Sequence, residues 1–286
     1  MNSALRFIGI TLIAGALSGY CSSALADSEQ KPLWELGIGV GTLGFNDYRG
    51  SKSSSFYPVP VPYFNYRGPF LRSDRDGVRA LFFGTDFLEL NVSLNVTTPV
   101  KSNAAGIRSG MPSLKSILEV GPSLDFHLWK SEDQRVKFDL RMPVRGAFTL
   151  DFPSRYVGWS FTPRLNVDIR DVGGHAGWDL GLMAGPVFQD QRYNQYFYDV
   201  APEFATTGRP EFKAAGGYSG TQLLASVSRR FPGYWVGAFV RHDLLGGAVF
   251  NASPLVQTHN YWMAGVGIAW IVGRSTTMVV APDERL

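Results

Sequence analysis

Alternation of apolar and polar residues with a period of two constrains this chain more than any other feature. It is clearest between residues 113 and 129. There the even positions include Leu114, Leu118, Val120, Leu124, Phe126 and Leu128, and the odd positions include Lys115, Glu119, Ser123, Asp125 and His127. Successive side chains of a β-strand point to opposite faces. The segment therefore predicts a strand with one apolar face and one charged face.

Two later segments repeat this alternation. Residues 135–150 set Phe138, Leu140 and Val144 against charged neighbours, and residues 154–170 set Val157, Trp159 and Phe161 against polar ones. Soluble β-sandwiches alternate too, but their strands usually have about 5 or 6 residues, whereas these run about 12 to 17. Strands of that length can cross a membrane with tilt, which favours a transmembrane β-barrel.

Aromatic residues and glycines support the same fold. The chain has 32 glycines and 14% aromatic residues, and after Leu17 no apolar run has the length of a membrane-spanning helix. Aromatic side chains gather near the ends of the alternating segments, as interfacial girdles of a barrel would. They include Tyr63, Tyr66, Phe70, Trp129, Tyr156, Trp178, Phe231, Tyr234, Trp235 and Trp270.

The fold we predict is all-β: a single antiparallel transmembrane barrel of about twelve strands. The strands are expected at residues 33–45, 56–67, 69–74, 77–84, 86–97, 113–129, 135–150, 154–170, 176–190, 220–231, 233–247 and 260–271. The third and fourth could instead be one bent strand. Long connections then alternate with short turns, which is typical of outer-membrane barrels with both termini in the periplasm. Prolines 58, 60 and 62 remove ladder donors and predict a poorly paired wall at the second strand.

The N-terminus predicts export. Arg6 precedes an apolar run from Phe7 to Leu17, and Ala24-Leu25-Ala26 offers a cleavage site, so residues 1–26 are expected to be a cleaved signal peptide. The mature barrel is then 27–286, with a short C-terminal tail after residue 270. Cleavage removes Cys21, the one cysteine, which excludes disulfides, thiolate metal sites and cysteine nucleophiles.

Net charge and histidines give little sign of chemistry. A net charge of +3 from scattered Lys and Arg disfavours nucleic acid and is explained by contact with outer-membrane lipid. His242 and Asp243 are strand neighbours on opposite faces, so they cannot form a base–orienter pair. His127 could activate Ser123 or Ser160, but a structural histidine in the lumen is favoured. We expect no catalytic residues, no cofactor and no metal site.

Charged residues are expected to line the lumen as a ladder in which acids and bases pair. The ladder comprises Lys115, Glu119, Asp125, Lys137, Asp139, Arg141, Arg145, Arg164, Asp168 and Arg170. A barrel of about twelve strands encloses a modest interior, which these long side chains could fill, so a filled barrel is favoured over an open pore.

The long connection at residues 191–219 is the candidate recognition loop. It carries Tyr193, Tyr196, Phe197, Tyr198 and Phe204. Aromatic side chains on an exposed loop suit contact with a protein or a glycan. A loop folded back into the barrel mouth as a plug would use them equally well.

Several segments resemble the MipA/OmpV family of outer-membrane proteins, and their order along the chain carries the resemblance. The matching stretches are Gly37-Ile38-Gly39-Val40-Gly41, Tyr48-Arg49-Gly50-Ser51, the Pro60-Val61-Pro62-Tyr63-Phe64-Asn65-Tyr66-Arg67-Gly68 stretch, Glu119-Val120-Gly121-Pro122, Tyr196-Phe197-Tyr198-Asp199-Val200 and Ala264-Gly265-Val266-Gly267-Ile268-Ala269-Trp270. Family barrels usually stop at an aromatic residue, whereas here Ile271 to Leu286 follow Trp270, so any signal for assembly would be internal.

The resemblance implies a function as well as a location. It implies a non-enzymatic outer-membrane scaffold that brings a murein-cleaving lytic transglycosylase together with a murein synthase, or a surface antigen or adhesin. A small-solute channel is the alternative from a different class, and a lipid-modifying enzyme is a third. The sequence sets neither the identity of a partner nor the oligomeric state.

Overall fold

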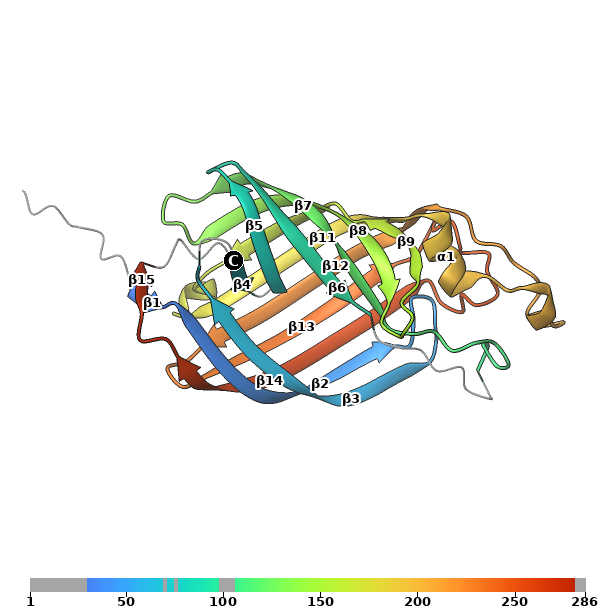
Figure 1. The fold of residues 1–286 in the computed structure, drawn as a ribbon, viewed down its shortest axis with the longest axis horizontal. Coiled ribbons are helices and arrows are strands. Elements are labelled where there is room, and N and C mark those ends of the chain that lie inside the picture. The colour runs from blue at the N-terminus through green and yellow to red at the C-terminus, as the bar shows by residue number, and fades with distance from the viewer. Residues whose placement is uncertain (1–29, 69–70, 75–76, 98–105, 281–286) are drawn as a thin grey trace, which may run out of the picture.

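The structure is a computed structural model that describes residues 30–68, 71–74, 77–97 and 106–280. The predicted fold is confirmed: antiparallel strands form one large curved sheet that makes the wall of a barrel (Figure 1). The predicted signal peptide, residues 1–26, lies outside the described residues. In the described part of the chain, no helix is long and apolar enough to cross a membrane.

Neighbouring strands in the sequence are mostly neighbours in the wall. The strands of the large sheet are β2 (Trp34–Asn46), β3 (Ser54–Tyr66), β4 (Leu71–Asp74), β5 (Gly77–Gly84), β6 (Leu88–Val96), β7 (Ile117–Lys130), β8 (Val136–Thr149), β9 (Tyr156–Phe161), β10 (Arg164–Ile169), β11 (Trp178–Gln189), β12 (Gly217–Arg230), β13 (Tyr234–Leu244) and β14 (Asn260–Arg274). The first and last long strands, β2 and β14, pair from Phe45↔Met263 to Glu35↔Arg274, which joins the two ends of the sequence in one wall.

The predicted and observed strands differ most clearly at two places. The segment 154–170 is two strands, β9 and β10, because Pro163 between them lacks a backbone donor. The final strand runs to Arg274 rather than 271, and a further strand, β15 (Met278–Val280), pairs with β1 (Gln30–Pro32) in a separate ribbon. The segment after residue 270 is therefore partly built into the fold. The uncertain pair β4 and β5 is a hairpin of two strands.

The two ends of the barrel differ. Figure 1 places the β1–β15 ribbon at one end, here called the terminal end, and the helix α1 (Gln191–Tyr198) at the opposite end, here called the loop end. At the loop end, four connections pack around a hydrophobic core, which includes Tyr48, Leu114, Tyr198, Ala214, Leu245, Ala248 and Phe250. These connections, residues 47–53, 106–116, 190–216 and 245–259, are called the loop cap below.

The faces of the wall follow the period of two. Along β8, Lys137, Asp139, Arg141 and Arg145 are buried, while Val144 on the other parity is exposed. An outward apolar face suits lipid, because the hydrocarbon region offers no partners for polar groups.

Three residues depart from the predicted faces. Because β7 begins only at Ile117, Leu114 and Lys115 precede the strand. Leu114 is buried in the loop cap rather than lipid-facing, and Lys115 is exposed beside Asp151 rather than in the lumen. Val157 was expected outside but is an extra residue in a bulge of β9 opposite β8, which turns it inward beneath α1.

The lipid-facing assignment of β7 can be tested by charge at two depths. Leu124 is 40% exposed at mid-strand and Leu128 is 45% exposed near the strand's end. Leu124→Arg should lower the free energy of unfolding by roughly 2 to 4 kcal/mol, and Leu128→Arg by roughly 0 to 1 kcal/mol, because the cost depends on depth in the bilayer. Urea unfolding in lipid vesicles measures both, and equal losses would contradict the assignment.

Candidate functional site

The candidate site is the barrel lumen, which contains a cavity of about 750 Å³. Its lining comes from most of the wall strands and from the loop cap. A volume of this size lies within the roughly 300 to 1,000 Å³ typical of small-molecule pockets. The interior is therefore only partly filled, which differs from the filled barrel favoured by the sequence. Part of its lining is charged and includes Glu119 on β7, Arg145 on β8 and Asp168 on β10.

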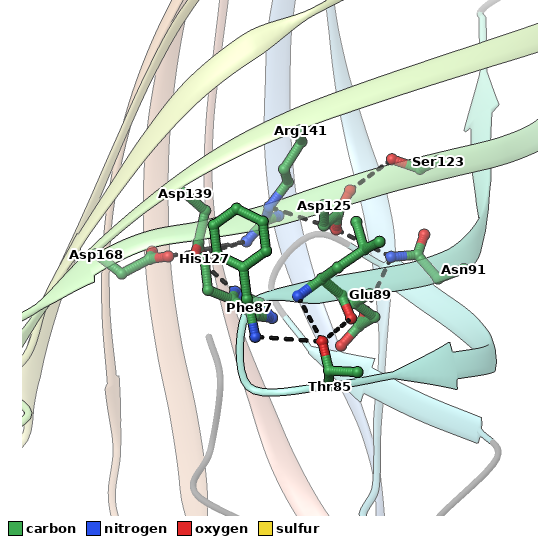
Figure 2. Close-up of polar contacts among 11 residues, drawn as sticks. Thr85, Phe87, Glu89, Asn91, Ser123, Asp125, His127, Asp139, Arg141 and Asp168 are labelled. Atoms are coloured by element: carbon green, nitrogen blue, oxygen red, sulfur yellow. Dashed lines mark hydrogen bonds and ion pairs between the residues drawn. The ribbon is translucent and has the colours of Figure 1, made fainter.

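The charged residues of β7, β8 and β10 that face the lumen are called the charged wall below: Glu119, Asp125, Lys137, Asp139, Arg141, Arg145, Arg164 and Asp168. A buried carboxylate on β7 organises its first part (Figure 2). Asp125 accepts hydrogen bonds from the Ser123 hydroxyl at 2.6 Å and from the Asn91 amide at 2.9 Å. Asn91 also donates to Glu89 at 3.0 Å. These residues come from β6 and β7, and alternate positions of each strand share the inner face.

Arg141 on β8 lies among three carboxylates. Its guanidinium nitrogens are 3.8 Å from Asp125, 3.8 Å from Asp139 and 3.9 Å from Asp168, as Figure 2 shows. His127 Nδ1 lies 2.8 Å from Asp139 Oδ1. Buried charges persist only where opposite charges and hydrogen bonds compensate the loss of water, and these residues meet that condition together.

The remaining predicted ladder residues divide between the lumen and its rims. Lys137 is buried directly opposite Asp168 on β10, and Arg164 lines the cavity. Arg170 follows the end of β10 and is half-buried at the terminal end. Lys115, as described above, lies outside the lumen at the loop end.

Glu119 connects the charged wall to the loop cap. Its carboxylate accepts hydrogen bonds from the Tyr193 hydroxyl at 2.6 Å and the Ser160 hydroxyl at 3.0 Å, and lies 4.0 Å from Arg145. Arg145 in turn donates to Ser93 on β6. Burial first, and then the neighbouring carboxylate, raises the pKa of Tyr193 well above its usual range, so the hydroxyl remains a donor.

A second group of buried charges, which the sequence analysis missed, lies under the loop cap. Arg49 and Arg241 each approach Asp243 to 2.7 Å, and Arg49 also donates to the Ser219 carbonyl at 2.6 Å. Arg241 and Asp243 are two residues apart on β13 and therefore share a face. That spacing could have indicated the Arg241–Asp243 pair. The contact with Arg49 could not be predicted in this way, because Arg49 is distant in sequence.

The aromatic residues of the predicted recognition loop close the loop end. Tyr193 and Tyr198 are buried, Tyr196 and Phe197 pack against the same clusters, and Phe204 packs beside Met111, Val200 and Leu255. Tyr193, Phe197 and Tyr198 line the cavity, and the Tyr198 hydroxyl donates to the Arg49 carbonyl at 2.9 Å. Their arrangement corresponds to the plug alternative rather than to a free aromatic surface.

An ion pair also crosses the lumen at the terminal end. Glu35 on β2 lies 2.6 Å from Arg230 on β12 and 3.4 Å from Arg67. Strands β2 and β12 are not neighbours in the sheet, so this contact spans the interior. The cavity thus lies between the Glu35 group and the loop cap.

The candidate catalytic groups are engaged elsewhere. The hydroxyls of Ser123 and Ser160 donate to carboxylates rather than to an imidazole. His242 stacks on Trp262 with ring centroids 3.9 Å apart, on the face opposite buried Asp243. Within the described ranges, no group of three or more His, Cys, Asp or Glu residues is placed to hold a metal ion.

Comparison with known proteins finds a matching family and two relatives. The model of the family described as MltA-interacting protein MipA matches residues 38–272. Outer membrane protein Omp26La of Vibrio anguillarum and outer membrane protein OmpV of Vibrio cholerae are each 25% identical over 237 residues, covering 81% of this chain and 84% of the relative.

Solved structures similar to the chain include the NanC porin, with a TM-score of 0.38 and 7% identity over 82% of this chain and 98% of that one. The outer membrane protein OprG of Pseudomonas aeruginosa gives a TM-score of 0.25 and 9% identity, covering 84% of this chain and 94% of that one.

The charged wall predicts an asymmetric response to alanine substitution. Asp139→Ala removes a partner of His127 and Arg141 and should lower the free energy of unfolding by roughly 3 to 5 kcal/mol, because a buried charge is left uncompensated. Lys52→Ala, in an exposed turn, is the control and should change it little. Heat-modified gel mobility compares them. Unaltered thermal stability of Asp139→Ala, together with altered ion selectivity in bilayers, would instead indicate a solvated channel wall.

Proposed function

Because the chain belongs to the MipA family, whose model matches most of its length, we propose that this outer-membrane barrel is a non-enzymatic scaffold for other proteins. The relatives from two Vibrio species are named as outer membrane proteins, which agrees with its location. The family description names an interaction with MltA, so a murein-cleaving lytic transglycosylase is the first proposed partner. A murein synthase is the second.

The β1–β15 ribbon is the observation that carries this proposal. It lies outside the barrel wall at the terminal end (Figure 1), where Gln30 pairs with Val280 and Pro32 with Met278. Backbone bonds from Leu33 to Thr277 and from Ser275 to Trp34 connect it to the wall. A short two-stranded ribbon has exposed backbone edges, to which a strand of another protein can add. We place both termini, and hence this ribbon, on the murein side of the membrane.

The loop cap supports a scaffold in a second way. Its connections share a core and are joined to the wall through Tyr193–Glu119 and Arg49–Asp243, so its outer surface is held in one conformation. A preorganised surface binds partners at a lower cost in conformational entropy. On the outer side of the membrane this surface would serve the alternative role of antigen or adhesin.

A small-solute channel is the second candidate function, and the 750 Å³ cavity favours it. Conductance across a planar bilayer separates the two. The wild-type scaffold should conduct little, whereas Tyr193→Ala, which removes a side chain between the cavity and the loop cap, should increase the single-channel current. A wild-type current as large as that of Tyr193→Ala would support the channel.

The third candidate, a lipid-modifying enzyme, is set aside in this proposal because the hydroxyls of Ser123 and Ser160, the candidate nucleophiles, donate to carboxylates. Mass analysis of lipid A and phospholipids from a deletion strain tests it. Lipid species that change in that strain and are restored by the wild-type gene would support an enzyme.

The scaffold predicts that partner capture depends on the ribbon. Met278→Glu should reduce crosslinking of murein enzymes to the barrel in whole cells by about tenfold, because an added charge at a half-exposed apolar contact disfavours docking. Thr207→Glu, on the exposed part of the loop cap, is the matched control and should leave capture unchanged. Mass spectrometry of the crosslinked material provides the readout. If only Thr207→Glu reduced capture, the result would contradict docking at the ribbon and indicate that partners dock on the loop cap.

A further inference from the structure

The hydrogen bonds between β3 and β2 show which backbone groups of β3 point away from β2, toward the other edge of the strand. The numbers of the two paired residues in this ladder always sum to 100, as in Val40↔Pro60. Just beyond its ends, Arg67 donates to the Leu33 carbonyl and Asp47 to the Ser53 carbonyl, so the odd residues direct their backbone groups toward β2. The even residues of β3 therefore direct theirs toward the opposite edge.

Prolines 58, 60 and 62 all lie on that outward parity. Three successive outward positions consequently lack an N–H group, and no ladder can form along the middle of this edge. The same absence prevents pairing with a strand of another chain, so the edge is protected from association rather than available for it.

The strands on the other side of this edge are short. Within the described residues, β4 pairs with β5 and no pairing joins it to β3. Strand β5 pairs with β6 only from Gly84↔Glu89 to Ala80↔Val92, which leaves Ser93 to Val96 without a strand partner on that side. In Figure 1, β11, β12 and β13 of the far wall are visible between β6 and β3.

Both margins of this interruption border the lumen cavity. Val59 and Val61 on β3 line it, and so do Leu94 to Thr97 beside the end of β6. Leu94 and Val96 have the outward parity of β6 and are 45% and 61% exposed, yet they contact the same cavity. The cavity therefore reaches the lipid-facing surface at the interruption, which is called the lateral window below.

We propose that the cavity binds a single-chain zwitterionic phospholipid, a lysophospholipid, which enters from the bilayer through the lateral window. This inference does not depend on the scaffold function. Entry from the side needs no passage through the loop cap, whose contacts to Glu119 and Asp243 then remain intact.

The acyl chain is assigned from the side of the cavity near the window. Its lining there is apolar and includes Leu43, Val59, Val61, Leu94, Val96 and Met263. Burial of a hydrocarbon chain against such side chains is favourable in proportion to the area removed from water. The cavity volume is in the range for one drug-sized ligand, which favours one chain over a lipid with several.

The headgroup is assigned from the part of the lining on β7, β8 and β10, next to the β6 margin of the window, where charges of both signs lie. Arg145 and Arg164 can approach a phosphate, and Glu119 and Asp168 can approach an ammonium group. A carboxylic acid alone would meet carboxylates as well as guanidinium groups. A zwitterionic head matches both, and this distinction separates a lysophospholipid from a fatty acid.

The experiment uses the full-length barrel in nanodiscs whose bilayer contains a photoactivatable lysophosphatidylethanolamine with a diazirine in its acyl chain. Mass spectrometry maps the labelled residues after irradiation. We expect labelling of inward-facing Val61 and Met263, reduced at least tenfold by excess unlabelled lysophosphatidylethanolamine but not by palmitate or maltose. Labelling restricted to outward residues such as Val240 would overturn the proposal. Equal competition by palmitate would overturn the headgroup assignment.

Variants locate the site. Val61→Trp places a larger side chain in the cavity and should reduce inward labelling at least tenfold, and Val59→Trp serves the same purpose if Val61→Trp fails to fold. Val240→Trp, on the outward face of β13, is the matched control and should leave labelling unchanged. Undiminished labelling in the folded cavity variants would overturn the site. Labelling that appears only when Tyr193→Ala opens the loop end would overturn entry through the window.

Discussion

The hydrogen-bonding requirement of the peptide backbone in lipid governs this structure. A bilayer core offers no water, so each strand must find partners in its neighbours, and the sheet curves into a wall in which β2 pairs with β14. Within this wall, whose described end strands β3 and β4 are not paired with each other, the period of two directs apolar side chains to lipid and leaves the inner face for polar ones. The lumen charges then compensate one another around Arg141 and Glu119, because little water remains to solvate them. In the described residues, this requirement is relaxed at the proline-rich edge of β3 and along Ser93 to Val96 of β6.

The strands were predictable because their signal is local. Alternation identified the lipid and lumen faces of β7 and β8 without any knowledge of their partners. It failed where it was continued past a strand end, at Leu114 and Lys115, and at Val157, where the bulge in β9 reverses the parity. The loop cap could not be derived in this way, because its core joins connections that are far apart in sequence. Asp243 illustrates the same difficulty: its β13 partner Arg241 was readable from the spacing, but Arg49 belongs to the other end of the chain.

The lumen and the loop cap act as one mechanical unit. Glu119 holds Tyr193 of α1, and Asp243 holds Arg49 beneath it, so displacement of the cap would expose two buried carboxylates at once. Aromatic packing alone would leave the position of the plug weakly specified, whereas charge-assisted hydrogen bonds to the wall fix its position and orientation. At the opposite end, Glu35 joins β2 to Arg230 on β12 and resists flattening of the barrel. The cavity thus lies between two ends that are joined by ion pairs and hydrogen bonds, and its least hydrogen-bonded boundary is the lateral window.

The β1–β15 ribbon has a consequence for the order of the chain itself. It brings Gln30 and Val280 into register, so the described ends of the polypeptide lie side by side outside the wall. A short peptide link there would make the backbone almost circular, and new ends could be opened in an exposed turn such as residues 131–135. In such a circular permutant, the β2–β14 pairing would change from a contact between segments distant in sequence into a connection between sequence neighbours. The order of the strands in the wall therefore does not depend on where the chain begins.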